Sequence, residues 1–448
     1  MTDTAGGDAL KSRIDAVRAA PTGLPRAALF SVGASVVFNL CRFGAVVLLA
    51  KFAGPQWVGA FDFASVAVAA PIVMFLALEL RAAYVADAHN EFPFGAYRAL
   101  RRIGLVAAAI LVCAALALRP LPDAPAGALA FMLAIGLGRV TLNSSELYYA
   151  DYQRRERLDR LATANLLRGI AMLAPFAILL PIAASANAGD SRAIGRSATL
   201  AATVCAVGWI AVWLLYDRRW TSRRHAQDAA WTWSQVLRLA WRALPLGCVI
   251  LMIHLGDSVP RWVMAGSGAS ADALGYFGAM RVVTLGVGLV MIQIATAAGN
   301  RLVVYFHADR SAFLRLAGRL LAIALALGVT MIAVAWALGE WFLGAAFSPE
   351  YAERSHDFIV LVAAQSVSLL ATVLGFMTTQ IGRFWIQVPV QAGILAATTL
   401  AALWFVPSDP VGGAALTAVT RSVVHVALYA CVVAATLRAT SPAPHRSL

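Results

Sequence analysis

The chain has 448 residues, of which 60% are hydrophobic and only 13% charged, and its mean hydropathy is +0.74. Soluble domains carry about 25% charged residues, so this composition excludes an ordinary soluble enzyme or binding module. The net charge of +13 would suit nucleic acid. However, the basic residues gather in alternate connections between apolar stretches, which is the positive-inside pattern of a membrane protein. We therefore expect no nucleic-acid partner.

Apolar stretches of about 20 residues, the length that crosses a bilayer core, recur along the whole chain. They predict an all-α integral membrane protein with both termini in the cytoplasm. The twelve predicted transmembrane helices cover residues 29–50, 58–79, 103–119, 127–149, 163–185, 197–216, 244–264, 275–297, 320–338, 357–379, 386–406 and 411–436.

A long basic connection at the middle of the chain divides the helices into two sets of six. In it, Trp233, Val236, Leu237 and Trp241 recur at helical spacing and predict an amphipathic helix on the membrane surface. The predicted parts are a cytoplasmic N-terminal segment (1–27), an N-lobe (28–216), a cytoplasmic linker (217–243), a C-lobe (244–437) and a cytoplasmic tail (438–448).

A weak internal repeat supports this division. At an offset of 216 residues, Gly59 aligns with Gly275 and Phe61 with Phe277. The matched segments have the same orientation, so we expect two six-helix bundles related by a pseudo-two-fold axis along the membrane normal.

Polar and charged stripes occur inside helices from both lobes. A charge within a membrane helix costs roughly 2.5–3.5 kcal/mol on insertion scales, so it usually faces a cavity or a partner. Seven such stripes favour a hydrated central cavity. The candidate substrate-binding residues are Arg42, Arg139, Arg281, Arg421, Asn39 and Asn143, and the candidates for ion coupling are His254, Asp257, Glu146 and His425.

The charge of these candidates indicates an anionic ligand, because guanidinium groups bind phosphate oxygens in pairs. Simpler alternatives remain open. A single stripe is more often helix-packing polarity, and Asp257 could merely neutralise Arg261 one helical turn away. Arg168, near the end of the fifth predicted helix, is expected to extend its head group to the membrane surface.

The sequence contains no recognisable catalytic motif. The chain has no Walker A loop, no Gly-x-Ser-x-Gly and no HExxH. Its five cysteines lie on different apolar helices without metal-ligand spacing, so we predict neither a metal nor another cofactor. Alternating access driven by an ion gradient is the mechanism that remains.

Three segments resemble one family of membrane transporters. They are Asp257 to Arg261 followed by Ala273-Leu-Gly-Tyr-Phe-Gly-Ala279, the stretch Ala70 to Arg81, and Ser348-Pro-Glu-Tyr351. With the span count and the halving, they make the chain similar to the multidrug/oligosaccharidyl-lipid/polysaccharide (MOP) exporter superfamily. The similarity is to the polysaccharide-transporter branch, which includes the O-antigen flippases.

This resemblance implies a flippase in the bacterial inner membrane. It would move an undecaprenyl-pyrophosphate-linked oligosaccharide from the cytoplasmic to the periplasmic leaflet, for lipopolysaccharide or exopolysaccharide assembly. Arg42 and Arg281 are similar in helix position to pyrophosphate-binding arginines of lipid II flippases. Further implied partners are membrane lipids, a polysaccharide polymerase and a chain-length regulator.

The sequence also departs from that pattern. Three residues separate Asp257 from Arg261, which puts the role of Arg261 in doubt, and the two extra C-terminal helices of lipid II flippases are absent. The alternative function is an ion-coupled multidrug exporter of the same superfamily.

Overall fold

The computed structural model describes residues 26–439 except 88–90, 119–120, 122, 156, 187–189, 220–229 and 381–385. The predicted N-terminal segment and tail lie almost wholly outside the described residues. All regular structure within them is helical. Eleven helical segments there are long and apolar enough to cross a membrane, and the 38-residue α13 runs among them as a twelfth. The predicted all-α membrane fold is confirmed.

The first bundle contains the helices of the N-terminal half. They are α2 (Arg26–Ala53), α3 (Pro55–Asp62), η1 (Phe63–Ala69), α4 (Ala70–Ala77), α5 (Leu80–Ala86), α6 (Phe94–Leu118), α7 (Ala128–Asn143), α8 (Glu146–Arg154), α9 (Leu158–Ala186), α10 (Ser191–Val212) and η2 (Trp213–Arg218). The second contains α12 (Trp233–Gly266), α13 (Ala271–Ala308), α14 (Arg310–Ala346), α15 (Pro349–Ala352), α16 (Ser355–Gln380), α17 (Gln387–Phe405) and α18 (Pro410–Ala439).

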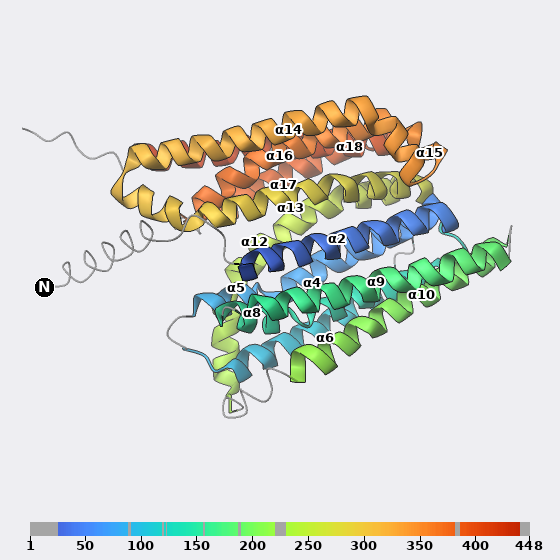
Figure 1. The fold of residues 1–448 in the computed structure, drawn as a ribbon, viewed down its shortest axis with the longest axis horizontal. Coiled ribbons are helices and arrows are strands. Elements are labelled where there is room, and N and C mark those ends of the chain that lie inside the picture. Colours follow the sequence, from blue (N-terminus) through green and yellow to red (C-terminus); the bar gives the residue numbers. More distant parts are fainter. Residues whose placement is uncertain are drawn as a thin grey trace, which may run out of the picture.

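The two bundles lie side by side, with their long helices running in the same general direction (Figure 1). Within each, neighbouring helices pack closely, as in α2 with α9 and in α16 with α18. Contact between the bundles runs mainly through α13 against α3 and α12 against η1 and α4. The second, seventh and eighth spans (α3 with η1 and α4, α12, and α13) therefore form the contact between the two bundles.

The outer surface of both bundles is apolar. Val106 and Ile110 on α6, and Trp336 on α14, each expose more than 60% of their surface, as does Trp404 on α17. A soluble protein would bury such side chains, whereas in a bilayer they contact lipid chains at no hydrophobic cost. This surface is what a multi-pass membrane protein requires.

At one end, here named the glycine end, the two bundles touch through their backbones. A Cβ on Gly59 of α3 would lie 2.1 Å from the carbonyl oxygen of Ala271, and a Cβ on Gly275 of α13 would lie 2.0 Å from that of Pro55. Only glycine permits this approach. The two contacts are reciprocal at the 216-residue offset, since Pro55 corresponds to Ala271. This reciprocity agrees with the expected pseudo-two-fold relation between the bundles.

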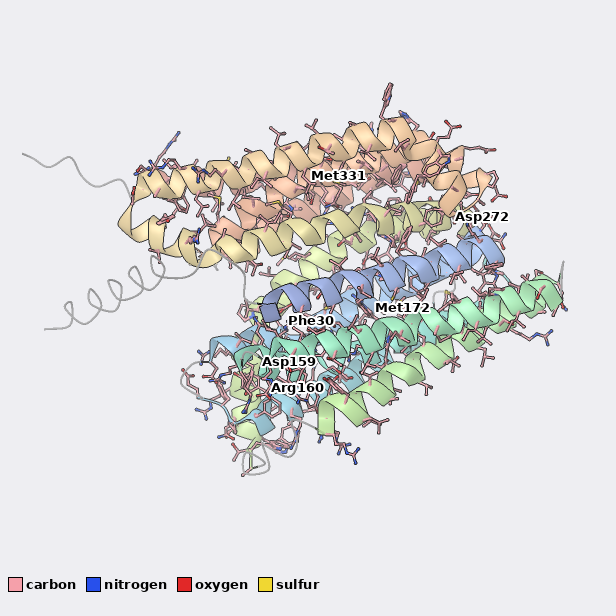
Figure 2. All side chains as sticks on the ribbon, viewed as in Figure 1. Phe30, Asp159, Arg160, Met172, Asp272 and Met331 are labelled. Atoms are coloured by element: carbon pink, nitrogen blue, oxygen red, sulfur yellow. The ribbon has the colours of Figure 1, made fainter. Side chains whose placement is uncertain are left out.

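The opposite end, here named the basic end, holds Arg98, Arg102, Arg154 and Arg218 at the helix termini. Figure 2 shows Asp272 at the glycine end and Asp159 and Arg160 at the basic end. The first part of α12 crosses the basic end of the N-terminal bundle before the helix turns into the C-terminal bundle (Figure 1). Pro245 lies inside α12, where its missing N–H permits a bend.

This first part of α12 differs from the predicted amphipathic helix in two ways. It is continuous with the seventh span, and the predicted apolar stripe is split. Val236 and Leu239 are buried against the N-terminal bundle, whereas Trp233, Leu237 and Trp241 expose 62%, 66% and 78% of their surface. One face thus packs on protein and a second apolar face points outward.

Candidate functional site

The four arginines predicted to bind substrate, Arg42, Arg139, Arg281 and Arg421, lie at one depth. Each is about three helical turns from one terminus of its helix. Those termini are Ala53 of α2, Ala128 of α7, Ala271 of α13 and Pro410 of α18. All four termini are at the glycine end. With a rise of about 5.4 Å per turn, the arginines lie roughly 15 Å from that end, near the middle of a bilayer core of about 30 Å.

Asp257 joins two of these arginines. Its Oδ1 accepts a hydrogen bond from Arg421 Nη1 and lies 3.5 Å from Arg281 Nη2. Arg281 also donates to Gln365 Oε1 at 3.0 Å, and Arg421 to the Ile253 carbonyl oxygen at 3.0 Å. Helices α12, α13, α16 and α18 therefore converge on one polar group, here named the Asp257 cluster, which is Asp257, Arg281, Gln365 and Arg421.

The Asp257 cluster is not sealed by packing. Its side chains remain accessible, with 27% of Asp257, 14% of Arg281 and 16% of Arg421 exposed. Two glycines let these side chains pack closely against the helices: a Cβ on Gly256 would lie 3.1 Å from Arg421 Nε, and one on Gly288 would lie 3.0 Å from Gln365 Nε2. Accessible charges at this depth need water or a polar ligand around them.

Arg42 and Arg139 supply positive charge from the N-terminal bundle. Neither makes a hydrogen bond or ion pair with the described residues, and Arg139 Nε is buried without a partner. The charge of Arg42 interacts with those of Asp62 and Arg261, and that of Arg139 with Arg42 and with His254. These two arginines therefore face the boundary between the bundles with their donors unused.

Arg261 belongs to a different arrangement, which the sequence pattern did not reveal. Its Nε and Nη2 donate to the two carboxylate oxygens of Asp62 at 2.5 and 3.1 Å, and its Nη1 donates to the Asp257 carbonyl oxygen at 2.6 Å. The guanidinium lies over the ring of Phe277 at 4.9 Å. Both charged side chains are under 5% exposed. The suggested neutralisation of Arg261 by the Asp257 carboxylate is wrong, because Asp62 fills that role.

The remaining candidates are more dispersed. His254 and His425 flank the Asp257 cluster, each interacting electrostatically with Asp257 and Arg421. Glu146 instead pairs with Arg81 at 2.9 Å, nearer the basic end. Asn143 is buried within the N-terminal bundle, with its amide nitrogen 3.9 Å from Met74 Sδ, and Asn39 donates to the Ser35 carbonyl of its own helix.

The balance of charge at mid-depth is positive. Four arginines (Arg42, Arg139, Arg281 and Arg421) accompany one aspartate (Asp257), which leaves three positive charges. Anions are attracted by such an excess where water is sparse, and guanidinium forks suit phosphate oxygens. Among the described residues no group of three or more His, Cys, Asp or Glu side chains is placed to hold a metal ion.

Two bundles of six spans, paired around mid-depth charges, define an all-α membrane transporter fold, and solved structures share it. A multidrug resistance MATE family transporter of the MOP superfamily, in an inward-facing conformation, matches with a TM-score of 0.65 at 11% identity, covering 92% of this chain and 100% of that one. The lipid II flippase MurJ, in an inward closed conformation, matches with 0.67 at 12% identity, covering 91% and 87%. A MOP superfamily transporter from Pyrococcus furiosus matches with 0.56 at 14% identity, covering 91% and 96%.

The chain therefore has the fold of the MOP superfamily, as its sequence segments predicted. It is also 23% identical over 393 residues to the capsular polysaccharide biosynthesis protein CapF of Staphylococcus aureus. The aligned residues cover 86% of this chain and 92% of the relative. No protein-family model matches the sequence.

Proposed function

We propose that the chain is a flippase for an undecaprenyl-pyrophosphate-linked oligosaccharide, which it moves across the bacterial inner membrane by alternating access. The basic end faces the cytoplasm, because positively charged connections are retained on that side. The glycine end then faces the periplasm. The direction of transport is outward, towards lipopolysaccharide or exopolysaccharide assembly.

The observation that carries this proposal is the common depth of Arg42, Arg139, Arg281 and Arg421. A pyrophosphate that crosses a bilayer needs donors at its midpoint, where water is least available. On one bundle, Arg42 and Arg139 donate to no described residue, and on the other Arg281 and Arg421 share one acid. A dianionic head group would fit between the bundles and compete with Asp257 for Arg281 and Arg421.

The contacts at the glycine end support a state that is open towards the cytoplasm. Gly59 and Gly275 bring the bundles together there. The Asp62–Arg261 ion pair joins the bundles about one helical turn further into the molecule. Transport would require these contacts to separate while the basic ends approach each other. The names of two similar proteins support this scheme: the lipid II flippase MurJ shares the fold, and a capsular polysaccharide biosynthesis protein is similar in sequence.

A reconstituted flipping assay tests the proposal. Purified protein in liposomes is given a fluorescent polyprenyl-pyrophosphate oligosaccharide, and the fraction reaching the other leaflet is measured by dithionite quenching. We expect Arg42→Gln and Arg139→Gln each to slow flipping about tenfold or more, because a charged hydrogen bond contributes about 1.5–3 kcal/mol. Arg42→Lys keeps the charge but not the fork, so it should retain part of the rate.

The matched control is the double variant Arg315→Gln/Arg319→Gln. It removes two arginines one turn apart near the start of α14, away from the bundle boundary, and should flip at the wild-type rate. Normal flipping by Arg42→Gln/Arg139→Gln would contradict the proposal. If the wild type moves organic cations and no lipid-linked sugar, the multidrug exporter of the same superfamily becomes the correct assignment.

A further inference from the structure

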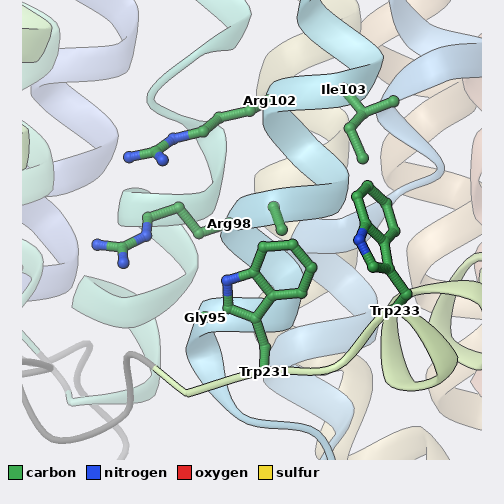
Figure 3. Close-up of a pocket in the computed structure, with 7 residues that line it drawn as sticks. Gly95, Arg98, Arg102, Ile103, Trp231 and Trp233 are labelled. Atoms are coloured by element: carbon green, nitrogen blue, oxygen red, sulfur yellow. The ribbon is translucent and has the colours of Figure 1, made fainter.

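A small pocket at the basic end, away from the bundle boundary, has the composition of a lipid site. Its volume is about 210 Å³, and it is lined by Gly95, Arg98, Ala99, Arg102 and Ile103 of α6 together with Trp231 and Trp233. Figure 3 shows the two arginine side chains extending to one side, with their guanidinium groups pointing away from the two indoles and Ile103. The transport path proposed above makes no use of these residues.

The pocket itself is lined by apolar groups, and two guanidinium groups lie beside it. Arg98 and Arg102 are one helical turn apart on one face of α6. Neither makes a hydrogen bond or ion pair with any described residue. Together with Arg218 of η2 they interact electrostatically with the Tyr148 hydroxyl, so three guanidinium groups share this region. Like charges held together with no acidic partner among the described residues favour an anion from outside the chain.

The apolar part of the pocket continues into the lipid-facing surface. Below the arginines, Ile103, Val106 and Ile110 recur on the same side of α6 with 44%, 62% and 63% exposure. Above them, Trp231 and Trp233 contact each other edge to face at 5.3 Å. Tryptophan side chains prefer the level of the lipid head groups. A charged site above an apolar track is the shape of one anionic phospholipid.

We propose that this pocket binds an anionic membrane phospholipid, with its phosphate on Arg98 and Arg102 and the first part of an acyl chain under Trp231 and Trp233. The rest of the chain would follow Ile103, Val106 and Ile110. Because Trp233 begins α12, the lipid would hold the start of that helix against α6. The other end of α12 carries Asp257, so the lipid links the cytoplasmic surface to the helix of the central cluster.

Native mass spectrometry and thermal unfolding of the full-length protein in detergent test this proposal, with phosphatidylglycerol and phosphatidylcholine as probes. Wild-type protein should retain phosphatidylglycerol in preference and gain melting temperature from it. Two arginines near a lipid surface contribute about 1 kcal/mol each, so Arg98→Gln/Arg102→Gln should bind phosphatidylglycerol roughly 30-fold more weakly. Arg98→Lys/Arg102→Lys should keep most of the binding.

The control is again Arg315→Gln/Arg319→Gln, which removes the same charge at a similar distance from a helix start and should leave lipid binding unchanged. Equal retention of the two lipids by the wild type would overturn the proposal, as would unchanged binding in Arg98→Gln/Arg102→Gln. Stabilisation by glycerol phosphate alone would also overturn it, because the site would then bind a soluble anion. If the wild type forms a dimer whether or not lipid is present, and Trp231→Ala/Trp233→Ala does not form it, the proposal would also be overturned. The pocket would then be a contact with a second copy of the chain.

Discussion

The Asp62–Arg261 pair and the Asp257 cluster are both built from aspartate and arginine, but they differ in how the charges are balanced. Asp62 and Arg261 form a one-to-one pair, bidentate and under 5% exposed, which joins α3 to α12 across the bundle boundary. In the Asp257 cluster one acid serves two arginines and stays 27% exposed. The first group is complete within the protein, whereas the second has donors in excess. The difference separates a contact that closes the molecule from one that can accept a ligand.

Removal of one member of the Asp62–Arg261 pair should have the largest effect. Asp62→Asn leaves Arg261 buried without its counter-charge, and broken buried pairs cost about 3–5 kcal/mol. We expect the melting temperature in detergent to fall steeply and cysteines placed at the glycine end to become reactive. The double variant Asp62→Asn/Arg261→Gln should recover part of this loss, because no unpaired charge remains.

The exposed pair of Arg242 and Glu91 is the control for this experiment. It also joins α12 to the N-terminal bundle, but its side chains are 58% and 49% exposed. Exposed pairs contribute little, so Glu91→Gln should scarcely change the melting temperature. Similar losses in Asp62→Asn and Glu91→Gln would show that burial does not distinguish the two pairs.

The glycine contact should rank next. In Gly59→Ala the new methyl group would meet the Ala271 carbonyl oxygen at 2.1 Å, a backbone atom that cannot move aside. Overpacking of this kind costs up to about 3 kcal/mol, so the bundles should separate at the glycine end. Oxidative cross-linking between Gln56→Cys and Asp272→Cys, whose native side chains are 3.3 Å apart, measures this in a background without native cysteines. Gly318→Ala, where nothing lies within 4 Å, should cross-link as before.

Asp257→Asn should have a smaller effect on stability and a distinctive effect on anions. It removes the shared acid from Arg281 and Arg421, and partial exposure lets water compensate, so we expect a loss of roughly 2 kcal/mol. Inorganic pyrophosphate should restore the melting temperature, because it binds the two freed guanidinium groups in the folded state. The wild type should respond less. An Asp257→Asn protein that pyrophosphate does not stabilise would contradict anion binding here.

The sequence was sufficient to predict the all-α membrane fold. Span lengths follow from hydropathy, and helical spacing places Arg42 with Asn39 on one face of a helix whatever the tertiary structure. The sequence could not predict which charged residues form ion pairs with one another. Arg261 is 199 residues from Asp62 and Arg421 is 164 from Asp257, so their contacts depend on how the two bundles meet.

Two further differences have the same origin. Arg168 was expected at the membrane surface, but it is 1% exposed, donates to the Leu142 carbonyl at 3.1 Å and lies over the Tyr149 ring. The apolar stripe at the start of α12 was expected to be one face, but protein covers Val236 and leaves Trp233 outside. Periodicity identifies an apolar or charged face, and only the neighbouring helices decide what covers it.

The smallest effect should come from Gln365, and its two variants sharpen the contrast between the charge groups. Gln365→Leu removes the 3.0 Å hydrogen bond to Arg281 Nη1, worth about 1 kcal/mol, so flipping should slow about fivefold. Gln365→Glu instead gives Arg281 an acid of its own and makes the Asp257 cluster resemble the Asp62–Arg261 pair. This variant should be at least as stable as the wild type yet flip more slowly than Gln365→Leu, because the ligand must then displace a second carboxylate. If Gln365→Glu flips at the wild-type rate, the excess of donors over acids is not what makes the cluster a binding site.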